Sequence, residues 1–377
     1  MITKIYWSPW KHPTFAMLFL AIFSLIGLGF IESCKVKKEQ PYIKKKLHAA
    51  KLAERAFQIL KPSLIKYKKP DYLDLDPTGS GFIGEFLTPV TSNSGSLSAK
   101  QTSINPNFAA VFVHYLKKAK LKEGDTVAIA LSGSFPALNV CLFAALETLK
   151  LKTIIISSTS ASQFGANHPQ MLWLDMEREL KLSGIFHFSS NYASLGGVQD
   201  KAIGMSKEGR EFLFSAIKRN QVQFLESDSF ESAIAKRTKI FEDLSQDVPI
   251  KAFINIGGGT TILGTSLGKQ VFRNGLIQSL PEEGHIPNSV ITYFLEKEIP
   301  VINTIQIETL ARKFGLPLSP KVLPKPGEGK VFFQEEYNPP LYLSVFVFLV
   351  FGLYGVTRLG WGENKKDLHL PRPLHPK

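Results

Sequence analysis

The sequence predicts an α/β protein, in which a parallel-sheet, Rossmann-like layered domain is flanked by an N-terminal and a C-terminal transmembrane helix. Three observations support this prediction. Short apolar runs alternate with segments of helical periodicity through the middle of the 377-residue chain. An uncharged apolar run lies near each end, and two of the central apolar runs lead into turns rich in glycine and serine. Apolar strands separated by helices are typical of a parallel sheet that is covered on both faces.

The first apolar run covers residues 14–31 and follows a short tail of residues 1–13. Its eighteen residues carry no charge, and that length is enough to cross a hydrocarbon core roughly 30 Å thick. A cleaved signal peptide is the alternative, but residues 29–33 lack the small-residue pattern of a cleavage site. A lipoprotein site at Cys34 is a second alternative, which the acid just before the cysteine disfavours.

Residues 35–66 are predicted to form a basic juxtamembrane helix. Ala50, Ala53, Phe57 and Leu60 recur at spacings of three and four residues, as expected for one apolar face of a helix. The run from residue 77 to residue 101 is rich in glycine, serine, threonine and proline, and is predicted to be a loop. Loops of this length in a compact domain are often functional.

The α/β domain is expected to span residues 67–316, because its apolar runs and helical segments alternate in order along the chain. Strands are predicted at residues 126–131, 153–157, 185–188, 251–256 and 300–303. Helices are predicted at residues 108–120, 136–149, 171–182, 207–219, 230–244, 288–296 and 305–314. Proline at the start of the 136–149 segment suits the first turn of a helix.

The second apolar run covers residues 340–357 and is the predicted C-terminal transmembrane helix. Residues 317–339, rich in proline and charge, are expected to be a linker, and residues 358–377 a tail. A buried core helix is the alternative for the second run. The chain has only two cysteines, so no disulfide framework defines its compartment.

The lysine distribution favours a cytoplasmic domain. Seven lysines lie within residues 35–51, against two before the first apolar run, and positive flanks stay in the cytoplasm. The second apolar run favours the opposite orientation, because five basic residues follow it while three closely precede it. The first helix usually dominates the orientation, so the soluble domain is expected on the cytoplasmic side of a two-pass protein.

The formal net charge of +13 points to an anionic partner. Lysines beside a membrane attract anionic lipids at about 1 kcal/mol per charge, which explains part of the excess, and a polyanionic ligand would explain the rest. The chain has no basic helix interleaved with stacking aromatic residues and no other nucleic-acid signature. We therefore expect no nucleic-acid partner.

A first ligand-binding turn is predicted at Ser132, Gly133 and Ser134, where a buried strand leads into a helix. In open parallel sheets, ligands bind at the carboxyl ends of strands. Backbone N–H groups at a helix start, with serine hydroxyls beside them, suit a phosphate or a carboxylate. The structural alternative is that Ser134 only caps the following helix.

A second turn follows the predicted strand at residues 251–256. It contains Gly257, Gly258 and Gly259, followed by two candidate N-cap residues, Thr260 and Thr261. Three consecutive glycines cost backbone entropy that a plain turn does not need, and close approach to an anion would justify that cost. The turn has neither the Gly-Lys-Ser/Thr of a P-loop nor the G-x-G-x-x-G spacing of a dinucleotide site. A nucleotide remains one of the ligands that this turn could bind.

Lys100 is the one candidate catalytic residue. With Lys100, the Ser132–Ser134 turn and the Gly257–Gly259 turn, the layout resembles fold-type II pyridoxal-phosphate enzymes, in which a lysine holds the cofactor and a glycine loop binds its phosphate. Two features depart from that pattern: Ser134 replaces an expected asparagine, and the loop has three glycines instead of four. An ordinary solvated lysine is the alternative. No zinc-ligand spacing and no nucleophile elbow are present, so no metal site is predicted.

Several longer segments together carry a more specific resemblance. They read GSGFIG, PVTSNSGSLSAKQTSINPNFAAV, SGSFPALN, ASQFGAN, WLDMERE, INIGGGT and GEGKVFFQEEYN. In the sequence and order of these segments, the chain resembles the bacterial poly-γ-glutamate system protein family. The resemblance covers nearly the whole chain. The resemblance implies an accessory role in the synthesis or export of this anionic capsule polymer at the cytoplasmic (inner) membrane.

The expected partners are therefore the other proteins of poly-γ-glutamate synthesis and export, membrane lipids, and the anionic polymer or a glutamyl ligand. The resemblance implies no catalytic mechanism. Whether the protein is an enzyme that acts on glutamate, glutamyl phosphate or the polymer end, or a membrane scaffold, stays open from the sequence.

Overall fold

The computed structural model describes residues 14–246, 248–282 and 284–366. They fall into two compact units: the described chain ends, up to Glu39 and from Phe333, form one, and residues Gln40–Phe332 form the other. The expected tail at residues 1–13 and the end of the expected C-terminal tail, residues 367–377, lie outside the described residues.

The terminal unit contains two apolar helices, α1 (Thr14–Ser33) and α13 (Pro339–Lys366). By length and composition both could cross a membrane, with a mean hydropathy of 2.4 over Thr14–Ser33 and 1.8 over Pro339–Val356. Only 6% of each of these windows is buried, whereas a core helix would be mostly buried. Helix α13 runs on to Lys366 and so includes the first part of the expected tail at residues 358–377.

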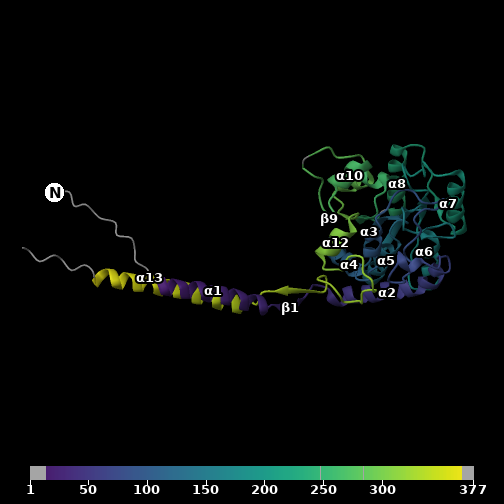
Figure 1. Ribbon diagram of the computed structural model, residues 1–377. Coiled ribbons are helices and arrows are strands. Elements are labelled where there is room, and N and C mark those ends of the chain that lie inside the picture. Colours follow the sequence, from purple (N-terminus) through teal and green to yellow (C-terminus); the bar gives the residue numbers. More distant parts are fainter. Residues whose placement is uncertain (1–13, 247, 283, 367–377) are drawn as a thin grey trace, which may run out of the picture. The chain divides into compact units, whose positions relative to one another are not determined.

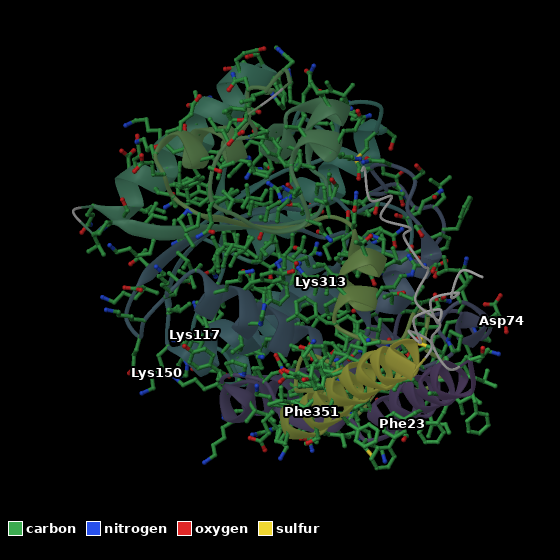
Figure 2. The ribbon with its side chains drawn as sticks, turned by 90° about the vertical axis from the view of Figure 1, so that its left-hand side faces the viewer. Phe23, Asp74, Lys117, Lys150, Lys313 and Phe351 are labelled. Carbon is green, nitrogen blue, oxygen red and sulfur yellow. The ribbon has the colours of Figure 1, made fainter. Side chains whose placement is uncertain are left out.

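The two apolar helices lie side by side (Figure 1). The rings of Phe23 and Phe348 have their centroids 4.3 Å apart, and Figure 2 shows Phe23 on one helix and Phe351 on the other. Next to the helices, strand β1 (Val36–Glu39) pairs antiparallel with strand β11 (Phe333–Glu336). All eight residues of this ribbon are exposed.

The second unit is built on a seven-stranded sheet in the order β7-β6-β3-β2-β8-β10-β9. Six strands run parallel, and only the edge strand β9 is antiparallel to its neighbour. The strands, in sheet order, are β7 (Gln223–Phe224), β6 (Tyr192–Ser194), β3 (Lys152–Ser158), β2 (Thr126–Ser132), β8 (Ile250–Ile256), β10 (Val301–Thr304) and β9 (Gly275–Ile277). The chain therefore forms a mixed α/β unit with a mostly parallel sheet, as the sequence predicted.

Alternating residues of β2 point to opposite faces of the sheet. Val127, Ile129 and Leu131 belong to one hydrophobic cluster, whereas Ala128 and Ala130 belong to another. The larger cluster includes side chains from α2 (Ile43–Ile65), α4 (Phe108–Lys118), α5 (Pro136–Leu149), α6 (Trp173–Leu182), α7 (Lys207–Arg219) and α12 (Ile307–Lys313). The smaller includes side chains from α8 (Phe230–Ser245), α9 (Thr260–Leu263) and α11 (Val290–Glu296).

Helix α2 is part of this folded unit, although the sequence placed it in a separate juxtamembrane segment at residues 35–66. Ala49, Ala53, Phe57 and Leu60 are buried, and α2 packs against α4 and α5 (Figure 1). The apolar spacing that predicted one face of a helix was therefore correct, but that face contacts protein. Basic residues such as Lys44, Lys45 and Lys51 remain outside the buried set.

Most central elements match the sequence prediction to within one or two residues, and three differences stand out. Residues 185–188 form no strand, and the strand in this region is β6, four residues later. The predicted loop at residues 77–101 ends inside a helix, α3 (Leu97–Ser103). The expected linker at residues 317–339 packs in part on the core, because Val331 and Phe332 are buried.

The remaining elements are short. They are a 3₁₀ turn at Tyr72–Asp74, a hairpin of β4 (Asn167–His168) with β5 (Met171–Leu172), and α10 (Thr265–Val271).

Candidate functional site

The two predicted turns follow neighbouring strands of the sheet. After β2 the chain adds β3, β6 and β7 on one side of it, and then returns to place β8 on the other side. The direction of winding therefore reverses between β2 and β8. In open parallel sheets, ligands bind at such a reversal, outside the carboxyl ends of the strands.

Gly257 brings the two turns into contact. Its φ is +104°, a conformation that favours glycine. A Cβ atom at this position would lie 2.8 Å from the Cβ atom of Ser132, closer than real Cβ atoms approach. Gly257 is thus required by its backbone conformation and by the close packing of one turn on the other.

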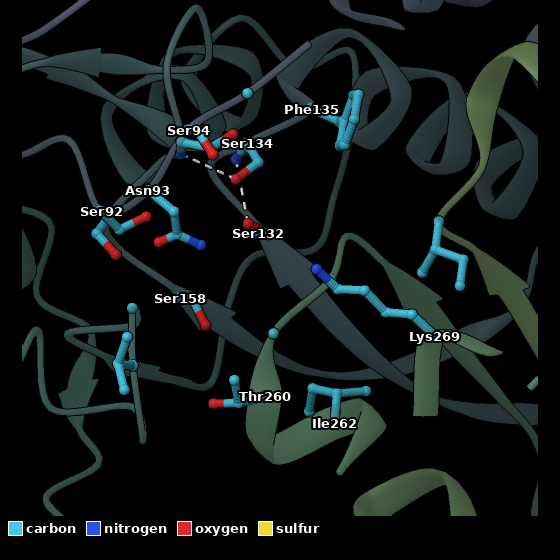
Figure 3. Close-up of a pocket in the computed structure, with 18 of the residues that line it drawn as sticks. Ser92, Asn93, Ser94, Ser132, Ser134, Phe135, Ser158, Thr260, Ile262 and Lys269 are labelled. Atoms are coloured by element: carbon cyan, nitrogen blue, oxygen red, sulfur yellow. Dashed lines mark hydrogen bonds between the residues drawn. The ribbon is translucent and has the colours of Figure 1, made fainter. Parts of the chain in front are cut away.

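A cavity of about 340 Å³ opens at this edge of the sheet. Ten of the described residues that line it carry a hydroxyl group: Ser92, Ser94, Ser96, Ser132, Ser134, Ser158, Ser160, Ser162, Thr260 and Thr261. Most of the sequence-predicted residues line it: Lys100, Ser132, Ser134, Gly258, Gly259, Thr260 and Thr261. Gly133 and Gly257 do not line the cavity but belong to the same two turns. Figure 3 shows several of these side chains around the opening.

Lys100 lies on α3, whose first turn is capped by the Ser96 hydroxyl. The side chain is 3% exposed, so the alternative of an ordinary solvated lysine is wrong. Its Nζ atom donates to the Ser134 carbonyl and lies 2.9 Å from Ser162 Oγ and 3.8 Å from the centroid of the Phe135 ring. Among the described residues no carboxylate pairs with it, and burial lowers the pKa of Lys100 to about 7.

Ser134 connects the residues of this corner of the pocket. Its hydroxyl accepts a hydrogen bond from Ser162 N at 3.0 Å, and its own N–H donates to Ser132 Oγ at 3.1 Å (Figure 3). The interpretation of Ser134 as a helix cap is wrong, because Phe135 occupies the N-cap position of α5 and makes no side-chain cap. The Ser134 hydroxyl instead positions the backbone of Ser162.

The glycine turn leads directly into α9. Gly259 holds the N-cap position, so the threonines lie in the first turn and are not the expected N-caps. A Cβ atom at Gly258 would lie 3.2 Å from Cε and 3.6 Å from Nζ of Lys269, on α10. Figure 3 shows the Lys269 amine pointing into the pocket. This exposed lysine places a positive charge beside the backbone of the glycine turn.

A buried ion pair at the pocket wall joins the loop after β6 to α8. Arg237 Nε donates to Asp200 Oδ2 at 2.7 Å, and Ser194 Oγ donates to Asp200 Oδ1 at 2.6 Å. Arg237 and Asp200 are 1% and 5% exposed. Asp200 is the only acid among the described residues that line the pocket, and Arg237 compensates its charge. Lys269 therefore makes the pocket electropositive, and Lys100 adds to this when protonated.

Sequence reasoning missed four parts of the lining: the Ser92–Ser96 segment, the serines after β3, the Asp200–Arg237 pair and Lys269. The serines after β3 carried a usable signal, because Ser158, Ser160 and Ser162 follow a predicted strand and its carboxyl end faces the same edge. Arg237 carried none, since it is one of three basic residues in α8. Lys269 carried none either, because no helix was predicted in its region of the chain.

The pocket offers few groups for chemistry other than anion binding. No group of histidine, cysteine and acidic side chains in the described part of the chain could hold a metal ion. Burial lowers the pKa of Lys100 to about 7, so its amine can exchange a proton near neutral pH. Comparison of the chain with protein-family models, with curated proteins and with solved structures found no match.

Proposed function

We propose that this protein binds an anionic ligand, carrying a carboxylate or a phosphate, in the pocket at the ends of β2 and β8. The observation that carries the proposal is the convergence of the glycine turn and the Lys269 amine on one hydroxyl-lined cavity. Asp200, the one acid that lines the described part of the pocket, is already paired with Arg237. Hydroxyls, backbone N–H groups and a lysine amine are the groups that bind carboxylates and phosphates.

We further propose a Rossmann-like layering of the soluble unit. The position of the pocket at a reversal of strand order supports this. So does the division of β2 side chains between two hydrophobic clusters, each of which includes helices.

The proposed location is the cytoplasmic (inner) membrane of a bacterium, with α1 and α13 as two membrane spans. Their hydropathy and their 6% burial support this placement, because an apolar helical stretch that buries so little surface in protein is suited to lipid. The lysines at residues 35–51 favour a soluble unit on the cytoplasmic side. Anionic lipids would then be partners of the exposed lysines in this stretch, such as Lys44, Lys45 and Lys51.

The proposed physiological role is that of an accessory component of poly-γ-glutamate synthesis or export. The resemblance of the segments quoted above supports this role, and an electropositive pocket suits a polymer with one carboxylate per residue. The expected ligand is a glutamyl unit or the polymer end, and the expected partners are the other proteins of the same system. A purely structural scaffold would leave the pocket without a ligand.

Lys100 favours a second candidate, an enzyme that depends on pyridoxal phosphate. Lys100 and the glycine turn are parts that this cofactor would need, one to hold it and one to bind its phosphate. When bound, the cofactor would supply an electron sink for reactions of amino acids. A visible absorbance band in the purified protein that Lys100→Ala abolishes would support this candidate, and a colourless active protein would remove it.

A thermal-unfolding screen of the full-length protein in detergent tests the binding proposal. Glutamate, poly-γ-glutamate, inorganic phosphate and nucleotides are added separately at matched ionic strength. A ligand present at a hundred times its dissociation constant should stabilise the protein by about 2.7 kcal/mol. Absence of a shift with every ligand would support the scaffold and contradict the proposal.

A further inference from the structure

A serine hydroxyl lies at hydrogen-bond distance from a buried lysine amine inside the pocket. Ser162 Oγ and Lys100 Nζ are 2.9 Å apart. A serine within reach of a basic group is the arrangement that activates a serine nucleophile, and a lysine can serve as that base. Ser162 lines the cavity, so a ligand in the cavity would reach its hydroxyl.

We propose that Ser162 is a nucleophile activated by Lys100, and that the pocket catalyses acyl transfer from an amide or ester that carries an anionic group. This inference rests on the proposed anion-binding function of the same pocket. It adds a reaction class and two catalytic residues.

Lys100 can act as the base because it is buried without a carboxylate partner. A paired lysine would stay protonated, whereas the pKa of Lys100 is lowered by burial to about 7. At neutral pH a large fraction of the amine is therefore uncharged. A neutral amine has one lone pair for the Ser162 hydroxyl proton and can still donate an N–H to the Ser134 carbonyl.

Ser134 acts as a positioning residue for this pair. Its carbonyl accepts from Lys100 Nζ, while its hydroxyl accepts from Ser162 N at 3.0 Å. One residue thus fixes the amine and the backbone of the nucleophile. Gly95 packs closely on this corner, because a Cβ atom there would lie 2.5 Å from the Gln163 carbonyl oxygen and 3.1 Å from Ser162 Oγ.

The reaction balances without a metal or redox partner. Ser162 Oγ attacks the carbonyl carbon while its proton passes to Lys100 Nζ. The tetrahedral intermediate then collapses, the bond to the leaving amine or alcohol breaks, and Lys100 returns the proton to that group. Water, or an amine acceptor, attacks the resulting ester of Ser162 with Lys100 again as the base, which regenerates the free hydroxyl.

The anionic group of the substrate would be held by Lys269 and the glycine turn. The lining also contains Ser160, which is 2% exposed and whose hydroxyl has no hydrogen-bond partner among the described residues. A buried hydroxyl without a partner carries a desolvation cost that a bound ligand would relieve. Ser160 is thus available to donate to a carboxylate or carbonyl oxygen of the substrate.

A fluorophosphonate probe tests the nucleophile directly. Full-length protein in detergent is incubated with the probe, digested, and analysed by mass spectrometry. We expect the label on Ser162, at a rate that rises with pH and has its midpoint at about 7. Lys100→Met should slow labelling by about 100-fold or more, because it removes the base.

Two matched variants control for nonspecific effects. Lys46→Met removes another buried lysine, whose Nζ donates to the Val331 carbonyl outside the pocket. Ser63→Ala removes a hydroxyl that donates to Glu179, also outside the pocket. Both variants should be labelled at the wild-type rate, whereas Ser162→Ala should not be labelled.

Two esters of similar length test the substrate class: mono-para-nitrophenyl glutarate, which carries a carboxylate, and para-nitrophenyl butyrate, which does not. We expect kcat/KM to be about tenfold higher for the glutarate ester, and Lys269→Gln to abolish this preference. Labelling at other serines, or none on Ser162 in folded wild-type protein, would overturn the inference. The binding function would survive that result if ligand-dependent thermal shifts were still observed.

Discussion

Two buried ionisable residues, Lys100 and Glu177, set the expected pH dependence of stability at the scale of single residues. Burial raises the pKa of Glu177 to about 7 and lowers that of Lys100 to about 7. Glu177, on α6, accepts from Ser190 N at 2.5 Å and from Ser190 Oγ at 2.8 Å. The two groups affect stability in different pH ranges. The pKa of Glu177 is raised from 4.5, so this residue acts below about pH 7. The pKa of Lys100 is lowered from 10.5, so this residue acts above about pH 7.

Glu177→Gln should flatten the stability profile on the acidic side. Between about pH 4.5 and about pH 7 the folded state binds more protons at Glu177 than the unfolded state does. The wild-type protein therefore loses stability as the pH rises through this range. Relative to wild type, the variant should gain about 3 kcal/mol between these limits. Urea unfolding of the full-length protein at a series of pH values measures this. Equal profiles would show that Glu177 titrates normally.

Lys100→Met should change the profile only on the alkaline side. Between about pH 7 and about pH 10.5 the unfolded state holds the Lys100 proton and the folded state does not, so wild-type stability rises with pH. The variant should lack this rise and match wild type in slope below about pH 7. Parallel profiles of variant and wild type between about pH 7 and about pH 10.5 would indicate that Lys100 keeps an ordinary pKa.

At the scale of elements, the turn that joins β8 to α9 should tolerate a side chain at Gly259 but not at Gly257. Gly257→Ala must place a Cβ atom 2.8 Å from Ser132 Cβ at a φ of +104°, and should cost about 1–3 kcal/mol. Gly259→Ala is the matched control, because its Cβ atom would meet only Ile262, at 3.7 Å. Urea unfolding of both variants measures the difference. Equal stability would contradict the close packing of the two turns.

The sequence predicted the central elements well because their signals are local. The strands that became β2, β3 and β8 are mostly apolar runs. The intervening helices have caps or regular apolar spacing. Strands β6 and β7 have only three and two residues, too few for a period to be recognised. Each is a strand because it pairs at the edge of the sheet, β6 with β3 and β7 with β6.

The candidate site was predictable only in part for the same reason. Both turns and Lys100 follow rules that apply within a few residues of the chain. The contact of Lys100 with Ser162 joins positions 62 residues apart, and the Asp200–Arg237 pair depends on how a loop folds over α8. Such pairings depend on the tertiary fold, and they cannot be predicted from local patterns in one sequence.

At the scale of the whole molecule, the proposed topology predicts where a reporter cysteine is accessible. Ser215→Cys lies on an exposed position of α7, in a background with Cys34→Ser, and Cys141 is buried. A membrane-impermeant maleimide should leave this cysteine unlabelled in intact cells and label it after permeabilisation. Ready labelling in intact cells would place the soluble unit on the outer side of the membrane and overturn the lysine-based orientation.

Direct calorimetric titration of the full-length protein with poly-γ-glutamate tests the central claim, that the pocket holds an anionic ligand. We expect saturable binding whose affinity falls about tenfold in Lys269→Gln, which corresponds to about 1.4 kcal/mol. Lys251→Gln removes the same charge from an exposed position of β8 that does not line the pocket, and should bind like wild type. Absence of saturable binding, or equal weakening by both variants, would contradict the account.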